Sequence, residues 1–306
     1  MRSAAFVIAS ACLLLGGCGG SSRPGDEGGE EAAAPVGSLE ALWRAPGEDV
    51  AIVPGTSDYG PGRNRVSFLV VDSRSRLVTS PTATVWVARG LKQAPFAEAT
   101  ARLVRIGVPG GAKADATDLY VVDVDLPRPG KYWLLAEPLN ASKRIQAIGQ
   151  VEVKQRTAAP AVGDRAIASH TPTLGSTGGD ITRLTTSTRP DRALYVSSVA
   201  DALAARAPFV VSFATPKYCQ SRACGPVVDV VSAVRRQFAG SGVRFIHVEI
   251  YEDNDPAKGT NRWVDEWKLP TEPFTFVVDR RGIVTAKLEG AFSASELSAA
   301  VERVQR

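Results

Sequence analysis

Residues 208–226 decide the fold of the C-terminal half, and they read PFVVSFATPKYCQSRACGP. The run 208–213 is apolar and rich in β-branched and aromatic residues, which is typical of a buried strand. The segment 214–223 that follows is a predicted loop holding a cysteine, Cys219. Beyond it, apolar residues recur at helical spacing and predict a helix from about residue 225 to 238. The apolar positions of that helix are Val227, Val230, Val231, Val234 and Phe238.

Further elements flank this segment. Composition and periodicity predict helices over 196–207, 261–267 and 294–304, and strands over 243–250, 274–278 and 283–288. Asp279-Arg280-Arg281-Gly282 supplies hairpin-turn chemistry between the last two strands. From residue 208 onward the order is strand, helix, strand, helix, strand, strand, helix. It predicts an α/β domain over residues 164–306, with its first two strands parallel and its last two antiparallel.

Two motifs in this half resemble the thioredoxin family. Phe213-Ala214-Thr215-Pro216-Lys217-Tyr218-Cys219 is similar to the approach to that family's active cysteine. Residues 272–279, followed by Gly282, resemble its second signature, a cis-proline that opens the penultimate strand. The resemblance covers about residues 162–306 and points to membrane-tethered bacterial thiol-disulfide lipoproteins. It implies a catalytic pair, Cys219 and Cys224, and a substrate groove made by Pro273, Glu272 and Tyr218.

The cysteine spacing departs from the family pattern. Four residues stand between Cys219 and Cys224, where the family has two. In one alignment Cys219 is the first family cysteine and Pro226 the proline of the helix. In the other, Cys224-Gly225-Pro226 corresponds to the Cys-Gly-Pro with which the family's active-site motif begins, and Val227 stands in place of the second cysteine. We favour the first alignment, because the aromatic approach ends directly at Cys219. Two further departures are Ser212, which stands where the family has a buried acid, and Tyr218, which stands where tryptophan is common.

Helix geometry limits how the two cysteines can pair. Residues five apart within a regular helix have Cα atoms roughly 8–9 Å apart, beyond the ~7 Å limit for a disulfide. If the pair bonds, the helix should begin between Ser221 and Cys224, with Ser221 as its N-cap. One sulfur would then lie near the helix N-terminus, where the dipole and the nearby Arg222 lower a thiol pKa. Glu272 would either shuttle protons or raise the thiol pKa by charge repulsion.

The N-terminus predicts export. One basic residue, Arg2, precedes an apolar run from Ala4 to Leu15 that is too short to span a bilayer. Leu15-Gly16-Gly17-Cys18 resembles a bacterial lipobox, in which cleavage removes residues 1–17 and leaves Cys18 lipidated. The alternative is an ordinary secretory signal. Residues 18–38, chiefly Gly, Ser, Pro, Ala and acid, predict a disordered tether. We therefore expect a lipid-anchored protein on the extracytoplasmic face of the cell membrane.

Cysteine usage favours chemistry at the remaining pair. Of the four cysteines, Cys12 would leave with the signal peptide and Cys18 would carry lipid. Cys219 and Cys224 would remain in a compartment where disulfides persist. Their bond closes a very small loop, so its effect on the entropy of the unfolded chain is modest. Such a pair is more useful as a reactive site than as a staple.

The N-terminal half reads as all-β. Short strands rich in β-branched and aromatic residues are predicted at 65–71, 83–87, 102–106, 119–124, 132–135 and 150–153. Their number and spacing predict an immunoglobulin-like sandwich over 39–153, followed by a linker at 154–163. We expect this sandwich to bind a protein partner or to act as a spacer.

Three functions remain open from the sequence. The first is a thiol-disulfide oxidoreductase that acts on thiols or disulfides of envelope or secreted proteins. The second is a redox-silent binding module in which the cysteines form a structural disulfide. The third is copper handling by two thiolates and His247, a residue that more often packs in the core. The favoured interpretation, the first, requires no cofactor and no metal site. Nucleic acid is not expected as a partner, because the net charge is only +4 and the basic residues are scattered.

Overall fold

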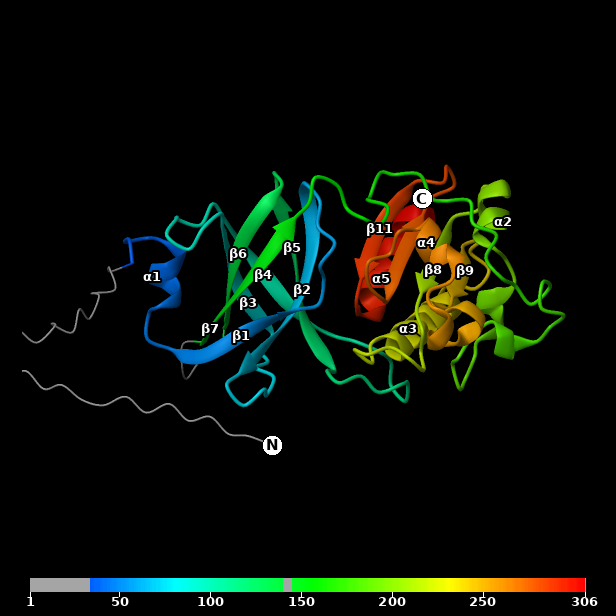
Figure 1. The fold of residues 1–306 in the computed structure, drawn as a ribbon, viewed down its shortest axis with the longest axis horizontal. Coiled ribbons are helices and arrows are strands. Elements are labelled where there is room, and N and C mark those ends of the chain that lie inside the picture. The colour runs from blue at the N-terminus through cyan, green and yellow to red at the C-terminus, as the bar shows by residue number, and fades with distance from the viewer. Residues whose placement is uncertain (1–33, 140–144, 306) are drawn as a thin grey trace, which may run out of the picture. The chain divides into compact units, whose positions relative to one another are not determined.

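The structure, a computed structural model, describes residues 34–139 and 145–305 (Figure 1). These residues belong to one compact unit. The predicted signal peptide, the predicted lipidation site Cys18 and most of the predicted tether lie outside the described residues. Among the helices of the described ranges, none has the length and apolar character needed to cross a bilayer.

Seven strands of the N-terminal half close into a barrel in the order β1-β2-β5-β4-β3-β6-β7. Neighbouring strands are antiparallel except β1 and β7, which run parallel and close the barrel. A short helix, α1 (Leu39–Trp43), precedes the first strand. The strands are β1 (Glu48–Pro54), β2 (Gly62–Asp72), β3 (Thr82–Ala88), β4 (Ala97–Arg105), β5 (Asp118–Leu126), β6 (Gly130–Pro138) and β7 (Ile145–Val153).

Alternating apolar residues fill the barrel. In β3 the side chains of Ala83, Val85 and Val87 are fully buried, while the residues between them are partly exposed. Successive side chains of a strand point to opposite faces, so one face of each strand lines the interior. The largest fully buried side chains of this interior are Phe68, Tyr120, Leu126 and Tyr132.

The predicted fold class, an immunoglobulin-like sandwich followed by an α/β thioredoxin-like domain, is wrong. Most of the strands in the described chain belong to the closed, mixed barrel, and the helices are few. Short alternating strands separated by turn residues are common to sandwiches and barrels, so the local pattern does not distinguish them. Closure depends on the parallel pairing of β1 with β7, which brings Val50 beside Ala147. The expected strands do not include β1 at all.

The C-terminal half contains a four-stranded sheet in the order β11-β10-β8-β9. Strands β8 and β9 are parallel, and β10 is antiparallel to both β8 and β11. The elements lie within a few residues of their predicted positions. They are α2 (Val199–Ala204), β8 (Phe209–Phe213), α3 (Cys224–Gln237), β9 (Arg244–Val248), α4 (Arg262–Glu266), β10 (Phe274–Val278), β11 (Val284–Glu289) and α5 (Ala294–Gln305).

Helices cover both faces of this sheet. Val210 of β8 belongs to an apolar cluster with residues of α3 and α5, whereas its neighbour Val211 packs with residues of α2 and α4. This alternation follows from the two-residue period of a strand. It explains why β8 reads as one continuous apolar run, since both faces of the strand are buried.

Buried polar contacts join the barrel to the edge strand β11. The carboxylate of Glu289 accepts hydrogen bonds from the Ser57 N–H (3.0 Å), the Ser57 hydroxyl (2.7 Å) and the Asp58 N–H (2.9 Å). The Lys287 ammonium lies 2.9 Å from the carboxylate of Asp58, which is 2% exposed. A buried charge is tolerated only when it is paired in this way. The predicted division into domains at 39–153 and 164–306 stays a prediction.

Candidate active site

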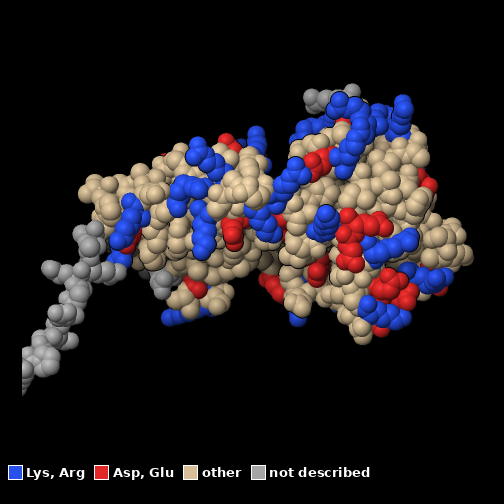
Figure 2. Space-filling model, turned by 45° about the horizontal axis from the view of Figure 1, so that its top comes forward, with Lys and Arg blue, Asp and Glu red and all other residues tan. Residues whose placement is uncertain are grey.

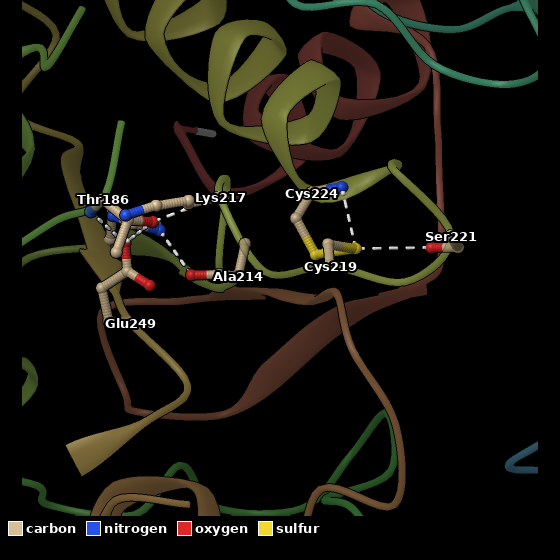
Figure 3. Close-up of a disulfide and its surroundings, with 8 residues drawn as sticks. Thr186, Ala214, Lys217, Cys219, Ser221, Cys224 and Glu249 are labelled. Carbon is tan, nitrogen blue, oxygen red and sulfur yellow. Dashed lines mark hydrogen bonds between the residues drawn. A yellow bond between two sulfur atoms is a disulfide. The ribbon is translucent and has the colours of Figure 1, made fainter. Parts of the chain in front are cut away.

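The two cysteines form a disulfide between the end of strand β8 and the start of helix α3 (Figure 3). Their Cα atoms lie 5.9 Å apart, which is within the range of disulfides. As predicted, the helix begins at Cys224 and leaves Cys219 in the preceding loop. Cys219 is 8% exposed and Cys224 is fully buried, so Cys219 is the more accessible residue of the pair.

The sulfur of Cys219 occupies the N-terminal end of α3. This sulfur accepts a hydrogen bond from the backbone N–H of Cys224 at 3.3 Å and lies 3.4 Å from the hydroxyl of Ser221. In the reduced protein, both contacts and the helix dipole would stabilise a thiolate at Cys219. The arrangement therefore distinguishes the two sulfurs, because the contacts that would favour a thiolate are those of Cys219.

Ser221 does not cap the helix as expected. The N-cap residue is Ala223, which has no side chain able to accept a hydrogen bond. The Cys219 sulfur takes up one of the free N–H groups of the first turn in its place. The backbone of Arg222 adopts a left-handed conformation (φ 52°), which turns the chain from the loop into the helix.

Two buried side chains hold the loop before Cys219. His247 on β9 donates from Nε2 to the carbonyl oxygen of Ala214 (3.0 Å) and accepts at Nδ1 from the hydroxyl of Tyr195 (2.7 Å). Ala214 is the first residue after β8, so this bond fixes where the loop leaves the sheet. Burial lowers the pKa of His247, while the charge of Glu249 and the bond to Ala214 oppose that effect. The ring is therefore neutral at pH 7.

A relay of hydrogen bonds fixes the middle of the loop. The Lys217 N–H donates to the Thr186 hydroxyl (3.1 Å), which donates to the carboxylate of Glu249 (2.8 Å). The Thr186 N–H donates to the same oxygen of Glu249 (2.5 Å). Glu249 follows β9 directly and is 5% exposed. Figure 3 shows this relay beside the loop, on the opposite side of Ala214 from the disulfide.

The residues expected to form the substrate groove are partly brought together. Pro273 precedes β10 with a cis peptide bond, and Phe274 pairs with Phe213, so Pro273 lies beside the start of the cysteine loop. The ring of Tyr218 packs edge-on against that of Tyr251, with centroids 6.3 Å apart.

Glu272 is half-buried, and desolvation raises its pKa. Burial raises the pKa of Tyr251, and the negative charge of Glu272 raises it further. Among the described residues, the hydrogen bonds of the Cys219 sulfur are with Ser221 and Cys224 and not with Glu272.

A neutral residue, Ser212, stands at the core position where the family resembled in sequence has a buried acid. Ser212 is fully buried in β8, and its hydroxyl forms a 2.8 Å hydrogen bond with that of Thr275 on β10. This neutral pair satisfies both hydroxyl groups and leaves no ionisable group at the position. Proton transfer at the sulfurs would therefore have to use another group or solvent.

The predicted third ligand for copper is already engaged. Both ring nitrogens of His247 are used in hydrogen bonds to protein groups. Within 34–139 and 145–305, no three His, Cys, Asp or Glu side chains are grouped so that they could hold a metal ion.

The sequence did not identify three residues of the site, Thr186, Glu249 and Tyr251. Glu249 could have been noticed, because it stands two positions after His247 and shares that face of an otherwise apolar strand segment. Thr186 lies in an irregular segment whose contact with Lys217 has no local signal.

The surface charge is mixed. On the face shown in Figure 2, Lys and Arg side chains are interspersed with Asp and Glu, and the basic ones gather at one upper edge.

Comparison with known proteins gives limited likeness. No protein-family model and no curated protein matches the chain. A thioredoxin-family thiol:disulfide interchange protein from Chlorobium tepidum TLS is a structural neighbour with 15% identity and a TM-score of 0.25, covering 33% of this chain and 81% of that one. MtrC from Shewanella baltica OS185 has 13% identity and a TM-score of 0.23, covering 39% of this chain and 24% of that one. The PKD domain of human VPS10 domain-containing receptor SorCS2 has 16% identity and a TM-score of 0.17, covering 45% of this chain and 94% of that one. These TM-scores are too low to assign a fold or a function to the chain, so the chemistry of the site follows from its own geometry.

Proposed function

We propose that the protein is a thiol-disulfide oxidoreductase in which Cys219 attacks and Cys224 resolves. One observation carries the proposal: the sulfur of Cys219, the more exposed residue of the pair, accepts the N–H at the start of α3. A thiolate in that position is stabilised without any other charged partner. Tyr218, Pro273 and Glu272 would line the groove that receives the partner segment.

The exchange needs two steps. The Cys219 thiolate attacks one sulfur of a partner disulfide, forms a mixed disulfide and releases the other partner sulfur as a thiolate. Cys224 then loses its proton and attacks the Cys219 sulfur, which forms the internal disulfide and releases the second partner thiolate. The released thiolates take up two protons. Overall the partner gains two electrons, and the cysteine pair loses them. The same steps in reverse oxidise a partner dithiol.

The location and partners belong to the same proposal. The lipobox-like Leu15-Gly16-Gly17-Cys18 supports a lipid anchor at Cys18, on the extracytoplasmic face of the cell membrane. A disulfide can persist in that compartment. The partners would be thiols or disulfides of envelope or secreted proteins near the membrane.

Trapping tests the proposal. Cys224→Ser leaves the attacking sulfur without its resolving partner, so mixed disulfides through Cys219 should accumulate and disappear on reduction. Cys219→Ser is the matched control, and it should trap few or none. Equal trapping by both variants, or by neither, would remove the proposed roles.

Burial also supports a second candidate, a redox-silent binding module. Both cysteines belong to the apolar cluster packed between the sheet and α3. If the bond is structural, it should stay oxidised under strongly reducing conditions, and replacing both cysteines should leave partner binding intact. The reduction potential separates the two candidates.

A further inference from the structure

A loop of the barrel reaches the cysteine site. Residues 106–117 connect β4 to β5, and they contact the N-terminal end of α3 and the segment between the cysteines. On the cysteine side, the loop meets Gly225 and Pro226, which directly follow Cys224, Asp229 on the next turn, and Arg222. The loop therefore lies against the elements that carry both sulfurs (Figure 1).

The apolar part of this contact is close. Val108 packs against the extended apolar cluster of the sheet, α3 and α5, to which Cys219 and Cys224 also belong. A Cβ atom on Gly225 would stand only 2.9 Å from the Cβ of Ala112, and one on Gly107 would stand 3.4 Å from Pro226. The backbones approach so closely that Gly225 has no room for a side chain unless the loop moves.

Polar contacts fix the loop in this position. The carboxylate of Asp229 accepts a 2.6 Å hydrogen bond from the Ala112 N–H, and Arg189 donates to the Gly110 carbonyl oxygen at 2.9 Å. The Asp229 contact is charge-assisted and is the stronger type. The ion pair between Arg222 and Asp115 (3.5 Å) is largely exposed and contributes little.

We propose that the β4–β5 loop is a specificity-determining cover of the Cys219 site, which admits small thiols and extended cysteine-bearing segments but excludes cysteines on folded surfaces. This rests on the proposed function, because specificity matters only if Cys219 reacts with partners. The loop comes from a different half of the chain from the cysteines, so exchange chemistry and partner selection are divided between the barrel and the sheet. Partners would present the reactive cysteine on a flexible, protruding stretch.

Labelling of reduced Cys219 tests the cover directly. In the full chain carrying Cys224→Ser, the rate of modification at Cys219 is followed by peptide mass with N-ethylmaleimide and with a polyethylene-glycol maleimide. The cover should slow the bulky reagent much more than the small one. Asp229→Ala should raise the bulky-to-small rate ratio about tenfold, as expected when one charge-assisted contact is lost. Replacing residues 108–116 with a short glycine-containing turn removes the whole cover and should raise the ratio at least as much.

Two controls keep the outcome unambiguous. Lys113→Ala changes an exposed residue of the same loop and should leave the ratio unchanged. Asp229→Asn retains the shape of the side chain and should give an intermediate ratio. This variant tests the cover even if the protein with the replaced loop fails to fold. A ratio that stays at the wild-type value in Asp229→Ala and Asp229→Asn overturns the cover. Labelling measures access to Cys219 and not disulfide exchange, so an unchanged ratio would leave the proposed oxidoreductase function standing. If instead the ratio changes but the Cys224→Ser variant traps no partner, the oxidoreductase function is contradicted and the cover is not.

Discussion

The sulfur of Cys219 lies 3.3 Å from the backbone nitrogen of Cys224 and accepts its hydrogen bond. The same contact orders the start of α3, so the Cys219 sulfur and the helix N-terminus form one unit. Cys224 is the first residue of α3, so its N–H has no partner inside the helix, and the sulfur supplies one. Reduction of the disulfide would leave this acceptor position available to a thiolate.

Ser221→Ala should weaken the thiolate at Cys219. The variant removes the hydroxyl that lies 3.4 Å from the sulfur. The pH at which alkylation of reduced Cys219 reaches half its maximal rate should rise by about half a unit. Gln220→Ala, an exposed neighbour in the same loop, is the control and should leave the profile in place. An unchanged profile in Ser221→Ala would show that the hydroxyl does not act on the thiolate.

His247 should make stability depend on pH. Burial lowers its pKa in the folded state, so the unfolded chain takes up a proton at higher pH than the folded chain does. This contribution is fully present above the ordinary histidine pKa of about 6.5. It is lost as the pH falls from there towards the lowered value, by at most ~1.4 kcal/mol per pH unit. Urea unfolding of wild type and His247→Gln over this range should show a flatter dependence in the variant, and parallel curves would contradict this role.

Glu272 should produce the opposite dependence. Its pKa is raised from an ordinary value of 4.5 because the half-buried carboxylate is desolvated. The folded state therefore holds its proton to higher pH than the unfolded state, and stability falls as the pH rises through that interval. Glu272→Gln should unfold at higher urea concentration than wild type at pH 7 and at an equal concentration at low pH. Glu302→Gln on the exposed side of α5 is the control, and an equal gain there would remove the assignment.

Glu289 should hold the barrel to the sheet. Its carboxylate satisfies the N–H groups of Ser57 and Asp58 at a position that is 6% exposed. Glu289→Ala should lower the free energy of unfolding by about 3 kcal/mol, because these donors are left buried without partners. Asp125→Ala, an exposed acid on β5, should change it by less than about 0.5 kcal/mol. A small loss at Glu289 would mean that water replaces the carboxylate.

The sequence predicted the elements around the cysteines but not the fold of the whole chain. The apolar run at 209–213 and the valines of α3 carry strong local periods, so β8 and α3 lie where expected. The barrel depends on the pairing of β1 with β7, which are far apart in the chain, and no local period encodes that closure. The sandwich prediction was wrong for this reason.

The candidate site shows the same division. Cys219, Cys224 and Pro273 could be identified from motif and spacing, because their chemistry is local to the loop and to the start of β10. The relay from Lys217 through Thr186 to Glu249 joins three separate segments. The cover by residues 106–117 joins the barrel to α3. Contacts of this kind arise from tertiary packing, which the sequence pattern of either segment alone does not reveal.

The reduction potential of Cys219–Cys224 tests the central claim most directly. The full chain would be equilibrated in thiol buffers of defined potential and its free thiols counted by mass. Because the helix N-terminus stabilises the reduced Cys219 thiolate, we predict a potential within the catalytic range of about −120 to −270 mV. A value below about −300 mV would identify an inert structural bond and contradict the oxidoreductase function.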